Sequence, residues 1–195
     1  MFHPRRFYRH FVSWYEISVF RLRCRRYHVR CEIGKNTRIR HCQVKPKRDG
    51  TLVIGENCTL HGAKFSFYAS GGRIEIKDRV FINAYSRAGV YFHVKGKSTI
   101  MIGNDCLFSN SIDITTTDWH YILDEQDTIV NPEKNVRIGD HVWIGRKVTV
   151  CKGCSIPSNS IIGACSVVTK SYDEEGVIIA GDPAVIKKRG GRWKL

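Results

Sequence analysis

Cysteine and histidine are the residue types in this sequence best suited to metal binding or nucleophilic chemistry. The chain has eight of each, and Cys151 and Cys154 form a CxxC pair. A structural zinc site needs a second such pair or histidines at ligand spacing, and the sequence offers neither. Eight cysteines suit a disulfide framework only in a short secreted chain, so we expect reduced thiols and no metal requirement.

A second kind of chemistry is open to His120, which ends the polar segment TTTDWH and follows Asp118 by two residues. Imidazole titrates near neutral pH, so a neutral histidine can take a proton from a hydroxyl group as that group attacks. Adjacency in sequence does not by itself assign this role. The elements that must position such a histidine therefore come next.

Size and composition indicate one domain without a membrane span. The chain has 195 residues, of which 42% are hydrophobic, which is enough for a substantial single core. The apolar stretch FVSWYEISVF has about half of the roughly 20 residues that a bilayer requires, and a glutamate interrupts it. No small-residue cleavage site follows it, so we expect a cytoplasmic protein.

The positive charge of the chain is concentrated in its first quarter. The net charge is +14, and residues 1–48 hold fourteen lysines and arginines against Glu16 and Glu32. Such a basic arm can bind nucleic acid or an anionic membrane surface, or can simply be solvated.

A repeat of six residues defines the rest of the architecture. An α-helix would place its apolar residues three and four apart, and a strand two apart. One aliphatic anchor in every six residues instead predicts a short strand and a corner, with three such units per triangular coil and stacked coils that align the anchors into an apolar column. The anchors are Ile138, Ile144, Val150, Ile156, Ile162 and Val168, and the compact residues four positions later are Val142, Val148, Cys154, Ser160 and Ser166.

The same unit occurs upstream in less regular form. Glycine follows the anchor in IGDHVW, IGRKVT and IGACSV, where we expect it to give the corners backbone freedom. The segments KPKRDGT and YASGGR are predicted loops, SRAGVYFHVKGKS is either a loop or an irregular coil, and 118–135 is a predicted protruding loop because the period fails there. The upstream anchors are Ile33, Ile39, Ile54, Leu60, Ile76, Ile82, Ile102, Phe108 and Ile114.

The N-terminal residues have helical rather than six-residue spacing, which predicts a short basic amphipathic helix within an arm of residues 1–28. This helix would either cap the open end of the coils or bind an anionic membrane. The predicted apolar face contains Phe7, Phe11, Trp14, Tyr15, Ser18 and Leu22, whereas Arg5, Arg9, Glu16 and Arg23 lie largely elsewhere on the helical wheel.

From IGNDCLFSNSIDITTTDWH through VRIGDHVWIGRKVTV, SIIGACSVVTK and AGDPAVIKK, roughly residues 102–188, the chain resembles the hexapeptide-repeat acyltransferases. The resemblance is greatest to enzymes that O-acetylate bacterial capsular or lipopolysaccharide sugars. It implies an all-β, left-handed parallel β-helix over residues 29–188, with 189–195 as a tail. It also implies a homotrimer that uses acetyl-CoA as cosubstrate, with active sites between subunits.

The resemblance also implies site residues. His120 would be the general base, and the backbone amide of Arg146 would stabilise the oxyanion, although many relatives have a small residue at that position. Trp143 would wall the acetyl or acceptor pocket, or else pack on the next subunit. Acceptor-binding residues would be Asn83, Asp118 and Trp143, and cofactor-binding residues would be Trp143, Arg146, Gly163, Ala164, Thr169, Lys170 and Lys188.

Three alternatives stay open on the sequence. The same fold could acetylate an amino sugar, a small amino acid or an antibiotic hydroxyl, because acceptor choice depends on the least regular segments, 83–98 and 120–135. A zinc enzyme resembling the γ-type carbonic anhydrases would need paired histidines that His93, His120 and His141 do not provide. A nucleic-acid binder would rest on charge alone.

Overall fold

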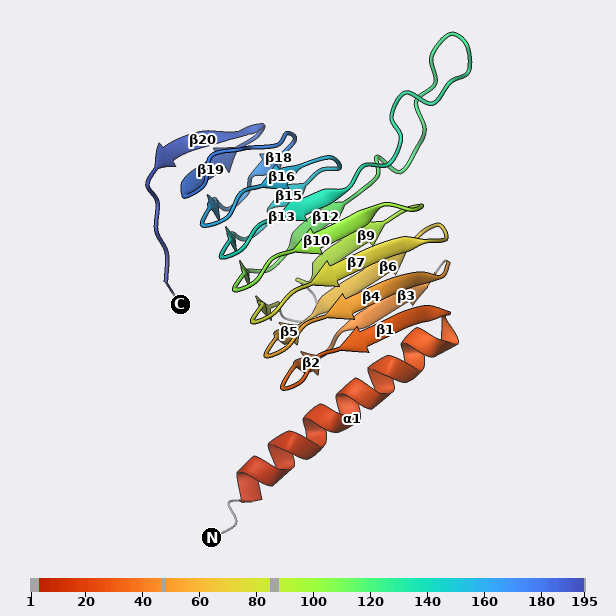
Figure 1. Ribbon diagram of the computed structural model, residues 1–195, viewed down its shortest axis with the longest axis vertical. Helices are drawn as coiled ribbons and strands as arrows, with labels where there is room; N and C mark the ends of the chain where they lie inside the picture. Colours follow the sequence, from red (N-terminus) through yellow and green to blue (C-terminus); the bar gives the residue numbers. More distant parts are fainter. Residues whose placement is uncertain (1–3, 47, 85–87, 195) are drawn as a thin grey trace.

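The protein is built from stacked coils of short parallel strands (Figure 1). The computed structural model describes residues 4–46, 48–84 and 88–194, with side chains from residue 14 onward, Pro46 excepted. In these residues the chain forms one helix, α1 (Pro4–Arg26), followed by twenty strands in three sheets.

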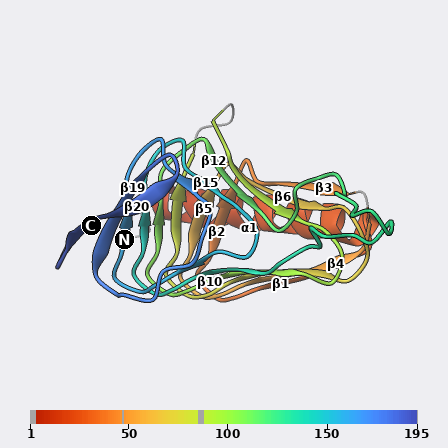
Figure 2. The same cartoon turned by 90° about the horizontal axis from the view of Figure 1, so that it is seen from above.

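The three sheets form the sides of a triangular prism (Figure 2). Sheet A contains β1 (Val29–Ile33), β4 (Gly50–Ile54), β7 (Gly72–Ile76), β10 (Thr99–Ile102), β13 (Val136–Ile138) and β16 (Ser155–Ile156). Sheet B contains β2 (Arg38–Arg40), β5 (Thr59–His61), β8 (Phe81–Asn83), β11 (Leu107–Phe108), β14 (Trp143–Ile144), β17 (Ile161–Ile162), β19 (Val177–Gly181) and β20 (Ala184–Arg189). Sheet C contains β3 (Gln43–Pro46), β6 (Ala63–Phe67), β9 (Val90–Val94), β12 (Ile112–Thr115), β15 (Thr149–Val150) and β18 (Val167–Val168).

The register of the sheets confirms the six-residue repeat. The chain runs from sheet A to B to C and back, every pair is parallel except the final hairpin of β19 and β20, and equivalent anchors lie opposite one another, as Ile138 does with Ile156 and Ile144 with Ile162. The upstream anchors follow the same columns, because Ile54 pairs with Ile76 and Leu60 with Ile82. These side chains are buried in one continuous core that runs the length of the prism.

The CxxC pair is a consequence of this packing. Cys154 is buried at the compact inward position, and Cys151 follows the Val150 anchor and is partly exposed. Both are free thiols, and burial raises the pKa of Cys154 to about 11. Within the described residues, no group of three histidine, cysteine, aspartate or glutamate side chains could hold a metal ion.

The glycines after the anchors do not have the predicted conformational role. Gly139, Gly145 and Gly163 are absent from the glycines with positive φ, and the left-handed corner residues come two positions later, as at Lys147 (φ 59°). Gly145 is required for a different reason: a Cβ there would lie 2.7 Å from the carbonyl oxygen of Ile162. These glycines therefore let adjacent coils approach closely.

Two further predictions about the loops can be checked in the described residues. The segment SRAGVYFHVKGKS contains a regular strand, β9, rather than an irregular coil, although residues 85–87 lie outside the described part of the chain. The protruding loop is present between β12 and β13, and we refer to residues 116–135 as the long loop (Figure 1).

Helix α1 lies across the first coil and packs against β1, β2 and β3. The predicted apolar face is not the face that packs, because Trp14, Tyr15 and Leu22 are exposed while Phe20 and Cys24 are buried. The side chains of Phe7, Phe11, Arg5 and Arg9 lie outside the described residues. In the part of the chain that is described, no helix is both long and apolar enough to span a membrane.

Candidate active site

The long loop carries His120 and leaves the prism at the corner where sheet C turns into sheet A. Both neighbouring coils hold its stem. Lys95, in the turn after β9, lies 3.0 Å from the Glu133 carboxylate and 3.7 Å from the centre of the Tyr121 ring. On the other side, Lys152 donates hydrogen bonds to the carbonyl oxygens of Asn131 (2.6 Å) and Pro132 (3.1 Å).

Asp118 belongs to this stem. Its carboxylate lies 2.5 Å from Nζ of Lys152 and accepts a hydrogen bond of 2.9 Å from the Asn131 amide. Partial burial is the largest influence and raises the pKa of Asp118, but the hydrogen bonds from Lys152 and Asn131 and the charges of Lys152 and Lys134 outweigh it and lower this pKa below its ordinary value. Asp118 is therefore an ionised anchor of the loop.

His120 itself is exposed, but the backbone on either side of it is fixed. Asn131 donates a second hydrogen bond, of 2.9 Å, to the carbonyl oxygen of His120. The preceding Trp119 has φ of 71°, a left-handed conformation that bulky residues rarely adopt. Such strain persists only where surrounding contacts enforce it, and it is frequent at functional sites.

The contacts that hold Trp119 in its left-handed conformation come from the outer surface of sheet C. The Trp119 ring meets the rings of Tyr68 (4.7 Å between centroids) and His93 (5.0 Å) edge to face. His93 is largely buried, with Nδ1 3.3 Å from the Tyr68 hydroxyl and Nε2 3.4 Å from the Asp113 carboxylate. The sequence did not predict these contacts of Tyr68 and His93 with Trp119, which we call the Trp119 clamp. The alternation in VYFHV could nevertheless have placed His93 on the outward face of its strand.

Five other predicted site residues lie near a different corner, where sheet B turns into sheet C. Trp143 lies on β14, Arg146 follows that strand, and Gly163 and Ala164 follow β17 in the next coil. Asn83 ends β8 at the same corner and is exposed. Figure 2, which looks down the stack of coils, shows sheet B and the long loop on opposite sides of the cross-section, so one subunit does not bring Trp143 and His120 together.

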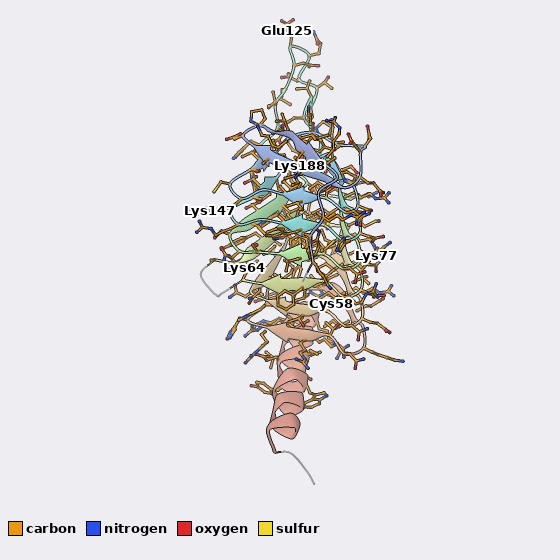
Figure 3. The ribbon with its side chains drawn as sticks, turned by 90° about the vertical axis from the view of Figure 1, so that its left-hand side faces the viewer. Cys58, Lys64, Lys77, Glu125, Lys147 and Lys188 are labelled. Carbon is orange, nitrogen blue, oxygen red and sulfur yellow. The ribbon has the colours of Figure 1, made fainter. Side chains whose placement is uncertain are left out.

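The predicted cofactor residues are thus divided between two corners. Thr169 and Lys170 follow β18 at the corner of the long loop, both exposed, and Nζ of Lys170 lies 5.8 Å from the centre of the Tyr172 ring. Lys188 is exposed on β20, in sheet B (Figure 3). The neighbouring Arg189 pairs with Glu174 at 2.9 Å.

The C-terminal tail also contributes an aromatic residue that the sequence did not predict. Trp193 stacks on His141, with ring centroids 4.3 Å apart, and lies 6.4 Å from Trp143. Its indole N–H donates to the carbonyl oxygen of His141 at 3.0 Å. The tail therefore folds back over sheet B beside Trp143 instead of extending into solvent.

Comparison with known sequences identifies the class of protein. Residues 135–170 match the family "Bacterial transferase hexapeptide (six repeats)". Over 173 residues the chain is 32% identical to an Escherichia coli K12 protein named "Putative lipopolysaccharide biosynthesis O-acetyl transferase WbbJ", covering 83% of this chain and 84% of that one. The chain therefore belongs to the hexapeptide-repeat acyltransferases, and it is an enzyme of that class.

Comparison with solved structures confirms the fold as a left-handed parallel β-helix. The polysialic acid O-acetyltransferase OatWY is similar at a TM-score of 0.64 and 27% identity, over 86% of this chain and 88% of that one. A hexapeptide-repeat acetyltransferase of Vibrio cholerae, solved with acetyl-CoA, shares the fold at a TM-score of 0.52 and 19% identity, over 89% and 77% of the two chains.

Proposed function

We propose that this enzyme transfers acetyl from acetyl-CoA to a hydroxyl group of a bacterial surface saccharide or its precursor, in the cytoplasm, with His120 as general base. The observation that carries this proposal is the placement of His120: it is exposed on the long loop, while Trp119 and Asn131 fix the backbone on both sides of it. A positioned base of this kind is what a weakly acidic sugar hydroxyl requires. The similarity to WbbJ and OatWY supports a saccharide as acceptor.

The proposed reaction is a direct transfer. Neutral His120 takes the proton of the acceptor hydroxyl as its oxygen attacks the thioester carbonyl carbon. The oxyanion that forms accepts a hydrogen bond from the backbone N–H of Arg146. Collapse of this intermediate breaks the carbon–sulfur bond, and the CoA thiolate leaves with the proton that His120 had taken. The products are the acetyl ester and CoA, and no metal is needed.

Acetyl-CoA binding is the first requirement of this proposal. We propose that the lysines among the cofactor-binding residues face the phosphates of CoA. The proposed cofactor-binding residues are Trp143, Arg146, Gly163, Ala164, Thr169, Lys170 and Lys188. A ligand that binds only the folded state at 100 times its Kd stabilises that state by about 2.7 kcal/mol. We therefore expect CoA and acetyl-CoA, measured by calorimetry and thermal unfolding, to bind and to raise the Tm. Absence of binding at millimolar concentration would contradict the assignment.

The acceptor is the second requirement. The consumption of acetyl-CoA should be screened against surface-glycan fragments, amino sugars and antibiotic alcohols. A saccharide hydroxyl as the best acceptor would support the proposal. Faster transfer to an amino sugar would favour N-acetylation by the same fold, because acceptor choice rests on loops rather than on the coils. Asn83, Asp118 and Trp143 are the residues that we propose contact the acceptor.

We also propose that the enzyme acts as a homotrimer with its active sites between subunits. Two observations support this arrangement. His120 lies on the long loop between β12 and β13, whereas Trp143 lies on β14 near another corner of the subunit, so a site that uses both needs two copies. The outer part of the long loop exposes Tyr121, Ile122, Leu123, Ile129 and Val130, an apolar group that a neighbouring subunit would cover.

Mixed trimers test this arrangement. Coexpressed His120→Ala and Trp143→Ala subunits, each with a different affinity tag and purified through both, should recover about one third of wild-type activity, because a cyclic trimer with both variants contains one intact interface in three. Each variant expressed alone should lose most of its activity. Mixed trimers no more active than the two parents would mean that both residues act within one subunit.

A further inference from the structure

Helix α1 has two faces with different surroundings. One face is part of the core: Phe20 and Cys24 are buried, and the Phe20 ring meets Phe65 edge to face at 6.1 Å between centroids. The opposite face exposes Trp14 (66%), Tyr15 (59%) and Leu22 (62%). Large apolar side chains exposed together along one helical stripe indicate a surface that another body covers.

Basic residues border this stripe. Arg21 and Arg25 lie beside Trp14 on the helical wheel, Arg26 lies beside Tyr15 on the other side, and all three are exposed. All the charged residues in the last turn of α1 are arginines, and its first turn has no acidic residue. Glu16 is directed away from the stripe, with its carboxylate 3.7 Å from Nε of Arg40. Arg21 donates a hydrogen bond of 3.4 Å to the carbonyl oxygen of Ile33 and is therefore directed toward the first coil. We call Trp14, Tyr15, Leu22, Arg25 and Arg26 the outer face of α1.

We propose that the outer face of α1 docks on the surface of an anionic lipid bilayer. Tryptophan, tyrosine and leucine on one stripe with arginines at its edges are the composition that helices use to lie in the interface between headgroups and acyl chains. Trp and Tyr suit this region because one end of each side chain is apolar and the other is polar. The arginines complement the negative potential of anionic headgroups.

The charged and apolar side chains of the outer face argue against two other binding partners. The outer face of a second copy would bring arginines against arginines, which is unfavourable. Nucleic acid would engage the arginines through phosphate but would leave the exposed Trp14 and Leu22 without an apolar partner. A bilayer surface provides anionic headgroups for the arginines and an apolar region for Trp14 and Leu22.

Flotation of the full chain with phospholipid vesicles tests the proposal. We expect binding to vesicles that contain phosphatidylglycerol, weak binding to pure phosphatidylcholine, and loss of binding at high salt. Each arginine near the surface contributes about fivefold to partitioning, so Arg25→Gln with Arg26→Gln should weaken binding by about thirtyfold. Trp14→Ser with Leu22→Ser should also weaken it, by about tenfold or more, while leaving the Tm nearly unchanged.

Lys77→Gln with Lys97→Gln is the matched control. It removes the same charge from exposed sites on the side of the prism and should change vesicle binding by less than about twofold. Equal losses in the control and the helix variants would overturn the proposal, since net charge alone would then explain binding. It would also be overturned by no binding to anionic vesicles, by duplex DNA binding in place of vesicle binding, or by helix variants that change the oligomeric state in sedimentation. None of these readouts uses acetyl transfer, so this test and that of the enzymatic function fail separately.

Discussion

Replacing His120 with alanine should lower the rate of acetyl transfer to a saccharide hydroxyl by about 10²- to 10⁴-fold, the usual contribution of a general base. The affinity for CoA should stay nearly the same, because the proposed cofactor-binding residues lie on later coils than His120. His120 is exposed and its removal leaves the Trp119 and Asn131 contacts in place, so the fold should survive. Initial rates and calorimetry with CoA separate the two effects.

His41→Ala is the control for this substitution, since it removes another exposed histidine from a corner of an early coil. Its rate should equal that of the wild type. An amine acceptor adds a second comparison, because its neutral form attacks with less help from a base. A large loss with an alcohol and a small loss with an amine would support hydroxyl transfer. Unchanged rates with every acceptor would mean that His120 is structural.

Replacing Phe20 with alanine should lower the free energy of unfolding by about 3 to 5 kcal/mol, the usual cost of truncating a buried phenylalanine. Phe20 is 2% exposed and closes the end of the core against Phe65, so its removal opens a cavity beneath the first coil. Urea denaturation of the two proteins measures the difference.

Leu22→Ala in the same helix is the matched control, because Leu22 is exposed and its truncation should change stability by no more than about 0.5 kcal/mol. Equal losses in the two variants would mean that helix propensity, rather than capping of the core, explains the effect. The same result would remove the reason for assigning the two faces of α1 different roles.

The β-helix could be predicted from the sequence because its signal is local and repeated. Each unit needs an anchor at one position, so Ile138, Ile144 and Val150 establish the period before any long-range contact is known. The long loop was predicted by the same reasoning, from the failure of the period after Ile114. The role of Gly145 was not, since the close approach of the next coil at Ile162 is a property of stacking rather than of the corner itself.

The sequence did not decide which face of α1 packs against the coils, because the helix carries apolar residues on more than one side. Periodicity finds a stripe through Trp14, Tyr15 and Leu22 but cannot say whether that stripe or the one with Phe20 and Cys24 meets the core. The shape of the first coil decides between them. Deletion of residues 1–22 would therefore remove Phe20 and disturb the core, and point substitutions on the outer face are the better test of membrane binding.

The candidate site was predictable only in part, because several of its contacts join residues that are far apart in sequence. His120 and Asp118 lie in a recognisable segment, but the Trp119 clamp joins Tyr68, His93 and Trp119 from three separate coils. Trp193 reaches His141 from the far end of the chain. Contacts between residues so distant in sequence leave no period to detect.

The stacking order of sheet A also fixes how far the coil that carries the long loop lies from α1. Three steps separate β1 from β10, the strand that opens the coil carrying the long loop, and strands in a sheet are about 4.8 Å apart. The first coil and the loop-bearing coil are thus roughly 15 Å apart, and Figure 3 shows the loop tip at Glu125 and α1 at opposite ends of the molecule. An enzyme lying on a bilayer through α1 would hold the proposed base, His120, above the headgroups. The number of coils would then favour sugars some distance along a lipid-linked chain over the sugar attached to the lipid.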